Sequence, residues 1–391
     1  MRSKVGSVRS GVGASHTPFL IVLILAVAVT PLTMWLIFGV QSDAPQNRVL
    51  QSLQERYSPE AVVNNRLNAR YQDENVDLIA DAPASGEATL DPDVLTFSYV
   101  PTDDPSAYEN VFVDLTTRLA KATGREVRYV PFTSLDEQLR ALGRGELHLA
   151  GLNTGAVPIA VNECGFVPIA NLGNDAGTST YTSMIIARKN SGITQPRDLE
   201  GKDVTFTSYG SNSGFKAPMV LLRDDHGLQV FRDYNPQMSN GHQQSIRGMA
   251  AGTYDVIAVA SDLLEREIAA GTLSRDDFVV VKESSPFPVA TIGHIHNLEP
   301  SLAAKIKAAL LDYSMAGTSE GTYFAQSGQT RFVDVNYKDE FDAVRLIDNQ
   351  AGFKHEVNLA DRPADASPAE PADAEVDADA DAAAEPEADP A

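Results

Sequence analysis

The sequence predicts an α/β fold of two similar lobes, with the chain crossing between them. From residue 94 to residue 152, segments alternate as strand, helix, strand, helix and strand. This order is typical of a parallel sheet with helices on both faces. The alternation continues to about residue 350 without a long insertion. A region of roughly 250 residues with this pattern indicates two lobes.

Turn and cap residues mark the first elements. The expected order is strand 94–101, helix 107–124, strand 125–132, helix 134–145 and strand 146–152. The first helix has apolar residues at helical spacing and ends on Gly124. The second opens on Ser134 with a carboxylate three residues later, which is typical of a capped helix start.

The rest of the region is less regular. Helices are expected at 218–227 and 301–313, and strand-like or apolar segments at 180–188, 202–209, 245–252, 255–261 and 276–284. The folded domain is therefore expected to span residues 94–350. Each lobe is expected to be a mainly parallel sheet flanked by helices.

An apolar run precedes this domain. Residues 1–16 carry three basic residues and no acid, and residues 17–40 contain no charge over 24 positions. Such a run can cross a bilayer core of about 30 Å, and its basic flank predicts a cytoplasmic N-terminus with the remaining chain outside. The alternative is a signal peptide cleaved near Ala28. We expect an uncleaved anchor, because cleavage would leave an apolar segment with Trp35 at the new N-terminus.

Two polar regions flank the domain. Residues 41–93 are expected to form a stalk that holds the domain off the membrane. Residues 351–391 form an acidic tail rich in Ala and Pro, in which 363–391 hold ten carboxylates and no basic residue. This composition cannot bury enough apolar surface to offset the entropy of ordering, so the tail is expected to be disordered.

Charge and residue content argue against several functions. The formal charge is −22, and a nucleic-acid partner, which needs a basic face, is not expected. The one cysteine, Cys164, cannot form an internal disulfide and is expected to be buried. His294 and His296 face one side of a predicted strand, but no third ligand lies near them in sequence. No metal or other cofactor is expected.

The stretch SYGSNSGFKAPMVLL, residues 208–222, lies between a predicted strand and a predicted helix. It fits neither the nucleophile elbow Gly-x-Ser-x-Gly nor the Walker loop. Ser213 and Lys216 match the Ser-x-x-Lys pattern of penicillin-binding enzymes, but no Lys-Thr-Gly follows anywhere in the chain. Two interpretations remain open. In the first, free N–H groups at the helix start bind an anion. In the second, Ser211 or Ser213 only caps the helix.

Four segments in order carry a family pattern. They are LTFSYVPTDDPSAYENVFVDLTTRLAKATGREVRYVPF, GRGELHLAGLNTGAVPIA, STYTSMIIARKNSGITQPRDLEGKDVTFTSYGSNSGFKAPMVLL and NGHQQSIRGMAAGTYDVIAVASDLLER. The third is the most specific and is similar to the family's Tyr-x-Ser-x-Ile-x-Val-Arg-Lys-x-Ser-Gly-Ile, Asp-Leu-x-Gly-Lys and Ser-Thr-Ser-Gly-Phe. With these segments, residues 94–348 resemble the periplasmic substrate-binding proteins of phosphonate, phosphite and phosphate ABC transporters.

The resemblance implies a periplasmic binding protein fold of type II, with a ligand cleft between the lobes. It implies that the protein is not an enzyme, and that it captures a small phosphonate, phosphite or phosphate-type oxyanion by hinge closure for an ABC permease. The domain would lie on the periplasmic side of the cytoplasmic membrane. The alternative function is ligand sensing or scaffolding, because a protein that only carries a ligand to a permease does not need the anchor, the stalk and the tail.

The resemblance also assigns ligand-binding residues. They are Ser211, Asn212 and Ser213 in the anion loop, Tyr181 and His242 from neighbouring loops, and Thr102, Asp103 and Asp262 at the ends of strands. Strand ends are where open α/β sheets bind ligands. His242 is expected to donate a hydrogen bond and to become cationic near neutral pH. Asp262 is expected to meet a ligand amine.

Two residues depart from the family pattern. Asn212 stands where the family usually has Thr, and it keeps a hydrogen-bond donor. Val157 stands near the place of a common aromatic residue, so it is expected to remove one wall of the pocket. With these departures two alternatives are open: the protein binds a different small oxyanion, or it has lost tight binding.

Overall fold

The computed structural model describes residues 51, 53–55, 57–58, 66–83, 89–99, 108, 110–355 and 357–360. The expected membrane anchor at 17–40 and the tail beyond residue 360 lie outside these residues. Within the described part, no helix has the length and apolar character needed to span a bilayer. The chain divides into one unit that ends at Val357 and a second, Asn358–Ala391. All elements named below belong to the first unit.

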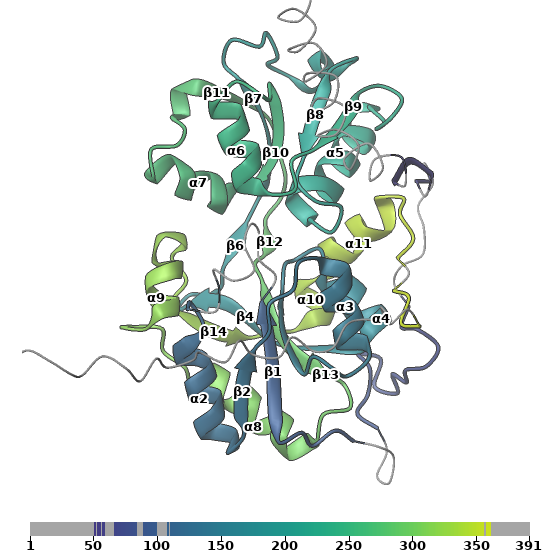
Figure 1. Cartoon of the computed structure of the whole chain (residues 1–391). Coiled ribbons are helices and arrows are strands. Elements are labelled where there is room, and N and C mark those ends of the chain that lie inside the picture. Colours follow the sequence, from purple (N-terminus) through teal and green to yellow (C-terminus); the bar gives the residue numbers. More distant parts are fainter. Residues whose placement is uncertain are drawn as a thin grey trace, which may run out of the picture. The chain divides into compact units, whose positions relative to one another are not determined.

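This unit contains two α/β lobes joined by two short crossing strands (Figure 1). The strands of lobe 1 are β1 (Val94–Tyr99), β2 (Glu126–Tyr129), β3 (Leu149–Leu152), β4 (Phe166–Asn174), β5 (Gly177–Thr178), β13 (Thr291–Ile295) and β14 (Arg331–Asp334). Its helices are α2 (Val113–Thr123), α3 (Leu135–Gly143), α4 (Val157–Cys164), α8 (Pro300–Leu311), α9 (Ser319–Phe324) and α10 (Tyr337–Glu340).

Lobe 2 is smaller and lies between the two crossings in sequence. Its strands are β7 (Ser183–Arg188), β8 (Asp203–Phe206), β9 (Asn235–Met238), β10 (Val256–Ala260) and β11 (Phe278–Glu283), and its helices are α5 (Ala217–His226), α6 (His242–Ala250) and α7 (Ser261–Ala269). The crossing strands β6 (Thr180–Tyr181) and β12 (Phe287–Pro288) pair antiparallel. A last helix, α11 (Asp342–Gln350), follows lobe 1. The predicted two-lobed α/β architecture is confirmed.

The sheets are mixed, which corrects the expectation of mainly parallel sheets. In lobe 1, β1 pairs parallel with β2 and β3, whereas β13 pairs antiparallel with β3 and β4. In lobe 2, β8 pairs parallel with β9 and β10, whereas β7 pairs antiparallel with β10 and β11. The reason is topological. Strands β13 and β7 enter their lobes from the crossing, so they run against the strands that end there.

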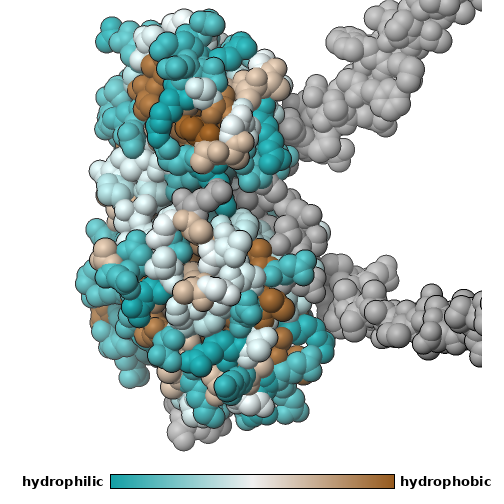
Figure 2. Space-filling view, turned by 90° about the vertical axis from the view of Figure 1, so that its left-hand side faces the viewer, coloured by the Kyte–Doolittle hydropathy of each residue, from teal (hydrophilic) through white to brown (hydrophobic). Residues whose placement is uncertain are grey.

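In the lobe 2 sheet, successive side chains of a strand point to opposite faces, and both faces pack against apolar residues. In β7, Ile185 and Ala187 join the apolar cluster under α5, while Met184 and Ile186 join the cluster under α6 and α7. Both faces of the lobe 2 sheet are therefore covered by helices. On the face shown in Figure 2, hydrophobic residues gather in the upper lobe and are otherwise scattered among hydrophilic ones.

Local signals place the first elements where the sequence predicts them. Ser134 accepts a hydrogen bond from the backbone N–H of Glu137 at the start of α3, as a capped start requires. Gly124 follows α2 with φ of 72°, the left-handed conformation that favours glycine. Helix α2 begins at Val113, six residues later than the predicted start at 107.

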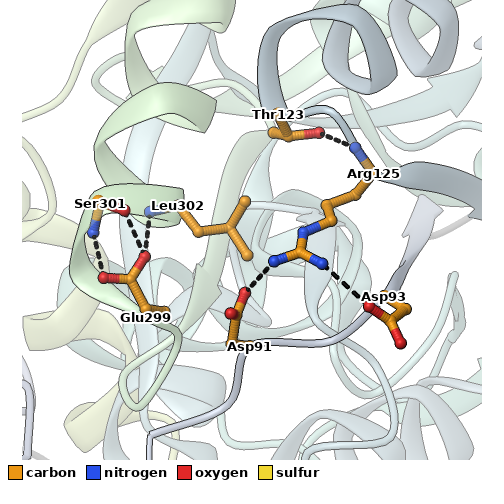
Figure 3. Close-up of polar contacts among 7 residues, drawn as sticks. All are labelled: Asp91, Asp93, Thr123, Arg125, Glu299, Ser301 and Leu302. Carbon is orange, nitrogen blue, oxygen red and sulfur yellow. Dashed lines mark hydrogen bonds and ion pairs between the residues drawn. The ribbon is translucent and has the colours of Figure 1, made fainter.

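An arginine fixes the segment that leads into β1 (Figure 3). The Arg125 guanidinium contacts the Asp91 carboxylate at 2.8 Å and the Asp93 carboxylate at 3.0 Å. Nearby, Glu299 accepts hydrogen bonds from the backbone N–H groups of Ser301 and Leu302 and so caps α8. The Arg125 pairs are partly exposed, so they specify the position of the chain more than they stabilise it.

The described residues before β1 include several that pack against the lobes, where a stalk that extends from the domain was expected. The Asn68 N–H donates to the carbonyl of Asn162 at 2.8 Å, and the Tyr71 ring lies edge-on to His296 at 4.8 Å. Leu53 is buried in lobe 2, and Tyr57 pairs with Phe353 in an antiparallel bridge. The folded unit therefore begins earlier and ends later than residues 94–350.

A buried ion pair holds α11 against lobe 2. The Lys216 ammonium, 2% exposed, contacts the Asp348 carboxylate on α11, 1% exposed. It also donates to the carbonyl of Gly155 in lobe 1 at 3.0 Å. Burial alone would raise the pKa of the Asp348 carboxyl, but Lys216 and His355 lower it to about 2. One lysine thus connects both lobes and the last helix.

Candidate functional site

A cavity of about 550 Å³ lies between the two lobes. Lobe 2 contributes the residues after β8, the start of α6 and the start of α7; lobe 1 contributes the ends of β1 and β3, the start of α3 and part of α9. These are mostly the carboxyl ends of parallel strands, where open α/β sheets bind ligands. Six predicted site residues line it together: Tyr181, Ser211, Asn212, Ser213, His242 and Asp262. Thr102 and Asp103 lie outside the described residues.

The helix after β8 begins earlier than predicted. A π-helical turn at Asn212–Lys216 precedes α5, so the polar residues form the first turn of the helix and not a preceding loop. Pro218 in the first turn of α5 has no N–H to donate to the carbonyl of Gly214. That carbonyl accepts from Thr207 N–H at 3.0 Å instead. The backbone hydrogen bonds of the turn join residues that are five apart. For example, Lys216 N–H donates to the carbonyl of Ser211.

Ser211 caps the helix, and its hydroxyl can still donate a hydrogen bond. Its Oγ accepts from the backbone N–H of Gly214 at 3.0 Å, as the capping interpretation predicted. It also lies 3.3 Å from Nε2 of His242. Because Nδ1 of His242 accepts from the N–H of Ala260, Nε2 carries the proton and donates to Ser211. With both lone pairs of Ser211 occupied, its own O–H is left to donate.

His242 is neutral, which corrects the expectation that it becomes cationic near neutral pH. The imidazole is buried at the start of α6. Burial, with a smaller effect of the Arg266 charge, lowers the pKa of His242 to about 4. At neutral pH it therefore acts through its single N–H and carries no charge.

Asn212 has a buried amide without a partner in the described part of the chain. The residue is 2% exposed, and its amide lies close enough to the Tyr181 hydroxyl to lower the pKa of that phenol, but neither Oδ1 nor Nδ2 makes a hydrogen bond of good geometry with a described residue. Buried polar groups are nearly always paired, and an unpaired one costs about 1–3 kcal/mol. Thr207, which lines the same cavity, also has a buried hydroxyl without a partner among the described residues. These groups can form hydrogen bonds with a ligand in the cavity.

Tyr181 places a phenol at the crossing between the lobes. It lies on β6 and is buried against Phe287 of β12, with ring centroids 6.2 Å apart. Burial raises the pKa of Tyr181, while the neighbouring polar side chains of Thr154, Ser213 and Asn212 oppose the rise. Tyr181 therefore stays protonated and can donate a hydrogen bond beside the first turn of the helix.

Asp262 and Arg266 form the charged part of the cavity. Both lie on α7, one turn apart, and both line the cavity. Burial raises the pKa of Asp262, opposed by the backbone N–H of Leu263 and the charge of Arg266. The Arg266 guanidinium lies over the ring of Tyr323 in lobe 1, 5.4 Å from its centroid. Sequence reasoning missed Arg266, although its position four residues after Asp262, which follows a predicted strand, was a usable signal.

Other predicted features lie elsewhere. Val157 is fully buried at the start of α4 and is not among the lining residues, so it forms no wall of the described cavity. His294 is buried with its Nδ1 against the carbonyl of Ile295. In the described ranges, no group of three or more His, Cys, Asp or Glu side chains is placed to hold a metal ion.

The two lobes touch directly beside the first turn of the helix. A Cβ atom on Gly155, in the loop after β3, would meet the carbonyl O of Gly210 at 2.3 Å and the N of Asn212 at 2.6 Å. Only glycine fits this approach of two backbones. Tyr209 of lobe 2 also donates a hydrogen bond from its hydroxyl to the carboxylate of Asp136 at the start of α3.

Comparison with known proteins identifies a family. A sequence model described as "ABC transporter, phosphonate, periplasmic substrate-binding protein" matches residues 97–340. The phosphate-import protein PhnD of Mycolicibacterium smegmatis is 24% identical over 282 residues, which are 70% of this chain and 84% of that protein.

Solved structures share the fold. PhnD1 of Prochlorococcus marinus in complex with methylphosphonate matches with a TM-score of 0.57 and 17% identity, over 66% of this chain and 97% of that one. A binding protein component of an ABC phosphonate transporter from Pseudomonas aeruginosa matches with a TM-score of 0.57 and 15% identity, over 66% and 87%. A Xanthomonas citri protein bound to ATP matches with a TM-score of 0.55 and 17% identity, over 66% and 98%.

Proposed function

The chain belongs to the family of periplasmic substrate-binding proteins of phosphonate ABC transporters, and from this premise we propose that it captures a phosphonate- or phosphate-type oxyanion and delivers it to an ABC permease. Members of this family are transport proteins, which favours transport over sensing or scaffolding. The family is periplasmic, so the folded unit acts outside the cytoplasm. Anchoring through residues 17–40 remains a prediction.

The buried, unpaired amide of Asn212 is the observation that carries this proposal. It lies in the first turn of a helix, where backbone N–H groups and the positive end of the helix dipole favour an anion. In the proposed site the O–H groups of Ser211, Ser213 and Tyr181 and the amide of Asn212 donate to the oxyanion. His242 orients Ser211 through its Nε2 proton.

The proposed site binds charge with neutral donors. Lys216 is the nearest cation on the same helix, but its ammonium is committed to Asp348 and to the carbonyl of Gly155. Fixed dipoles in a buried site stabilise an anion because they need no reorganisation when it binds, and the charge of Arg266, which lines the same cavity and acts on His242, adds to their effect. Asp262 is proposed to face the organic part of the ligand and not the oxyanion.

Closure of the lobes is the proposed mechanism of capture. The lobes are connected by the short antiparallel strands β6 and β12, and such short links between two rigid bodies are typical hinges. Donors for the oxyanion come mainly from lobe 2, while lobe 1 covers the other side of the cavity. A ligand that contacts both lobes favours the closed arrangement by its differential affinity for that state.

Gly155→Ala tests this mechanism. The added methyl would collide with the backbone of Gly210 and Asn212, so we expect the lobes to stay further apart and the affinity to fall at least tenfold. Energy transfer between dyes on Lys121→Cys in lobe 1 and Asp276→Cys in lobe 2 measures the separation. Native Cys164 will not react, because it is buried and burial raises the pKa of its thiol to about 12.

A matched control is Gly248→Ala. There the nearest group to the added methyl is the Tyr254 side chain, also in lobe 2, at 2.4 Å. We expect this variant to keep the wild-type response of the dyes to ligand. If Gly155→Ala closes on ligand as the wild type does, closure does not depend on this contact and the mechanism is wrong.

Calorimetric titration of the full chain in detergent tests the function itself. Methylphosphonate, phosphite and phosphate are titrated separately, with chloride held constant. Saturable binding of one ligand per chain by at least one of the three is expected. If none of the three and no larger phosphonate, phenylphosphonate included, binds or raises the melting temperature by mass action, the proposed function is wrong.

A further inference from the structure

We propose that the ligand is an aryl phosphonate or aryl phosphate ester, and not a small oxyanion such as methylphosphonate or phosphate. This proposal rests on the proposed function and names the organic part of the ligand. The cavity measures about 550 Å³. Pockets of roughly 300–1,000 Å³ enclose drug-sized organic molecules, so an oxyanion at the first turn of the helix would leave most of this volume for an organic group.

The wall that faces this volume is aromatic. Tyr99, Tyr108, Tyr323 and Phe324 of lobe 1 line the cavity and form one cluster. Ring centroids lie 5.1 Å apart for Tyr99 and Tyr108, and 5.5 Å apart for Tyr108 and Tyr323. The hydroxyls of Tyr108 and Tyr323 are within hydrogen-bonding distance of each other, at 3.2 Å. Edge-to-face and offset contacts with such rings favour a planar apolar group.

The charges of the cavity also favour an aryl group on the ligand. Among the described lining residues only Asp262 and Arg266 are charged, and they lie one turn apart on α7 with opposite signs. Arg266 covers Tyr323 from the lobe 2 side, which extends the aromatic wall with a flat guanidinium. An ammonium group on the ligand would meet Arg266 as well as Asp262, so an uncharged ring fits better than an aminoalkyl chain.

Gln138 adds one polar requirement. This residue of α3 is 1% exposed and lines the cavity, and its Nε2 donates to the hydroxyl of Ser98 at 3.1 Å. Its Oε1 is buried and makes no hydrogen bond with any described residue. A ring substituent with an N–H or O–H would satisfy this acceptor, and a plain alkyl group would not.

The test compares methylphosphonate, phenylphosphonate, 4-aminophenylphosphonate and 2-aminoethylphosphonate by calorimetric titration of the full chain in detergent. We expect phenylphosphonate to bind at least tenfold more tightly than methylphosphonate, and the 4-amino compound to bind more tightly still. The 4-amino gain is expected to disappear in Gln138→Leu. If methylphosphonate or 2-aminoethylphosphonate binds as tightly as phenylphosphonate, the proposal is overturned while the proposed function stands. If none of the four binds, both are overturned.

Tyr323→Ala separates stacking from a general loss of structure. This variant should bring the affinity for phenylphosphonate to within about twofold of the affinity for methylphosphonate. Tyr323→Phe should keep the aryl preference, because it retains the ring and loses only the hydroxyl. An aryl preference that survives Tyr323→Ala in a protein that melts as the wild type does would overturn the assignment of this wall.

Discussion

Asp348→Asn is expected to lower the free energy of unfolding by about 3–5 kcal/mol. The substitution keeps the shape of the side chain but leaves the Lys216 ammonium, which is 2% exposed, without its carboxylate. Removing one partner of a buried ion pair costs this much because the other charge stays desolvated. Urea denaturation of the wild type and the variant measures the difference.

Two further variants test the cause. In Asp312→Asn the same change is made where the carboxylate, paired with Arg118, is 82% exposed, and the expected cost is below about 1 kcal/mol. The double variant Lys216→Met with Asp348→Leu should be more stable than Asp348→Asn, because it removes both buried charges. Equal effects of Asp348→Asn and Asp312→Asn would show that the buried pair contributes little.

The same pair predicts how stability depends on pH. The folded-state pKa of Asp348 is about 2, below the ordinary value of 3.8. The unfolded chain therefore takes up this proton first as the pH falls. The contribution of the pair is fully present above about pH 4 and is lost as the pH falls toward 2. Acid titration of Asp348→Asn should lack this component.

The double variant Ser211→Ala with Ser213→Ala is expected to weaken oxyanion binding at least a hundredfold. Each serine would lose a hydrogen bond to a charged group, worth about 1.5–3 kcal/mol, and about 1.4 kcal/mol corresponds to tenfold in affinity. Without ligand, the stability should fall by only about 1 kcal/mol, because Ser211 also caps Gly214 N–H. Calorimetric titration and ligand-free melts measure the two effects separately.

Ser274→Ala supplies the matched control for this experiment. Ser274 caps a short 3₁₀ turn before β11 and does not line the cavity. Its loss should reduce stability by a similar amount and leave affinity unchanged. A Ser211/Ser213 variant that melts much lower but binds as the wild type does would mean that these serines only cap the helix.

Local chemistry explains what the sequence could predict. The Ser134 cap and the turn at Gly124 are decided by residues within four positions, so the start of α3 and the C-terminal end of α2 follow from the sequence. The polar residues from Ser211 to Ser213 were recognisable because the family pattern and the strand-to-helix order agree. The start of the helix at Asn212 was not, because the turn there is held by a hydrogen bond from the backbone N–H of Thr207, outside the helix, to the carbonyl of Gly214.

Long-range packing explains what the sequence could not predict. Gln138, Tyr323 and Arg266 line one cavity but come from α3, α9 and α7, which lie far apart in sequence. No periodic pattern connects them. In the same way, Leu53 looks like one apolar residue in a polar stalk until its partners in lobe 2 are known. The neutral state of His242 likewise follows from burial between elements, which residue type does not encode.

Two segments near the ends of the described part of the folded unit meet on lobe 2, and this makes the fold suitable for circular permutation. Tyr57 and Phe353 pair in an antiparallel bridge, with their ring centroids 5.4 Å apart. A short linker could join these ends without crossing the cavity, since neither residue lines it. New termini could then be opened at the exposed turn around Asp175, between β4 and β5. The order of the lobes along the chain can thus be changed while the cavity between them is kept.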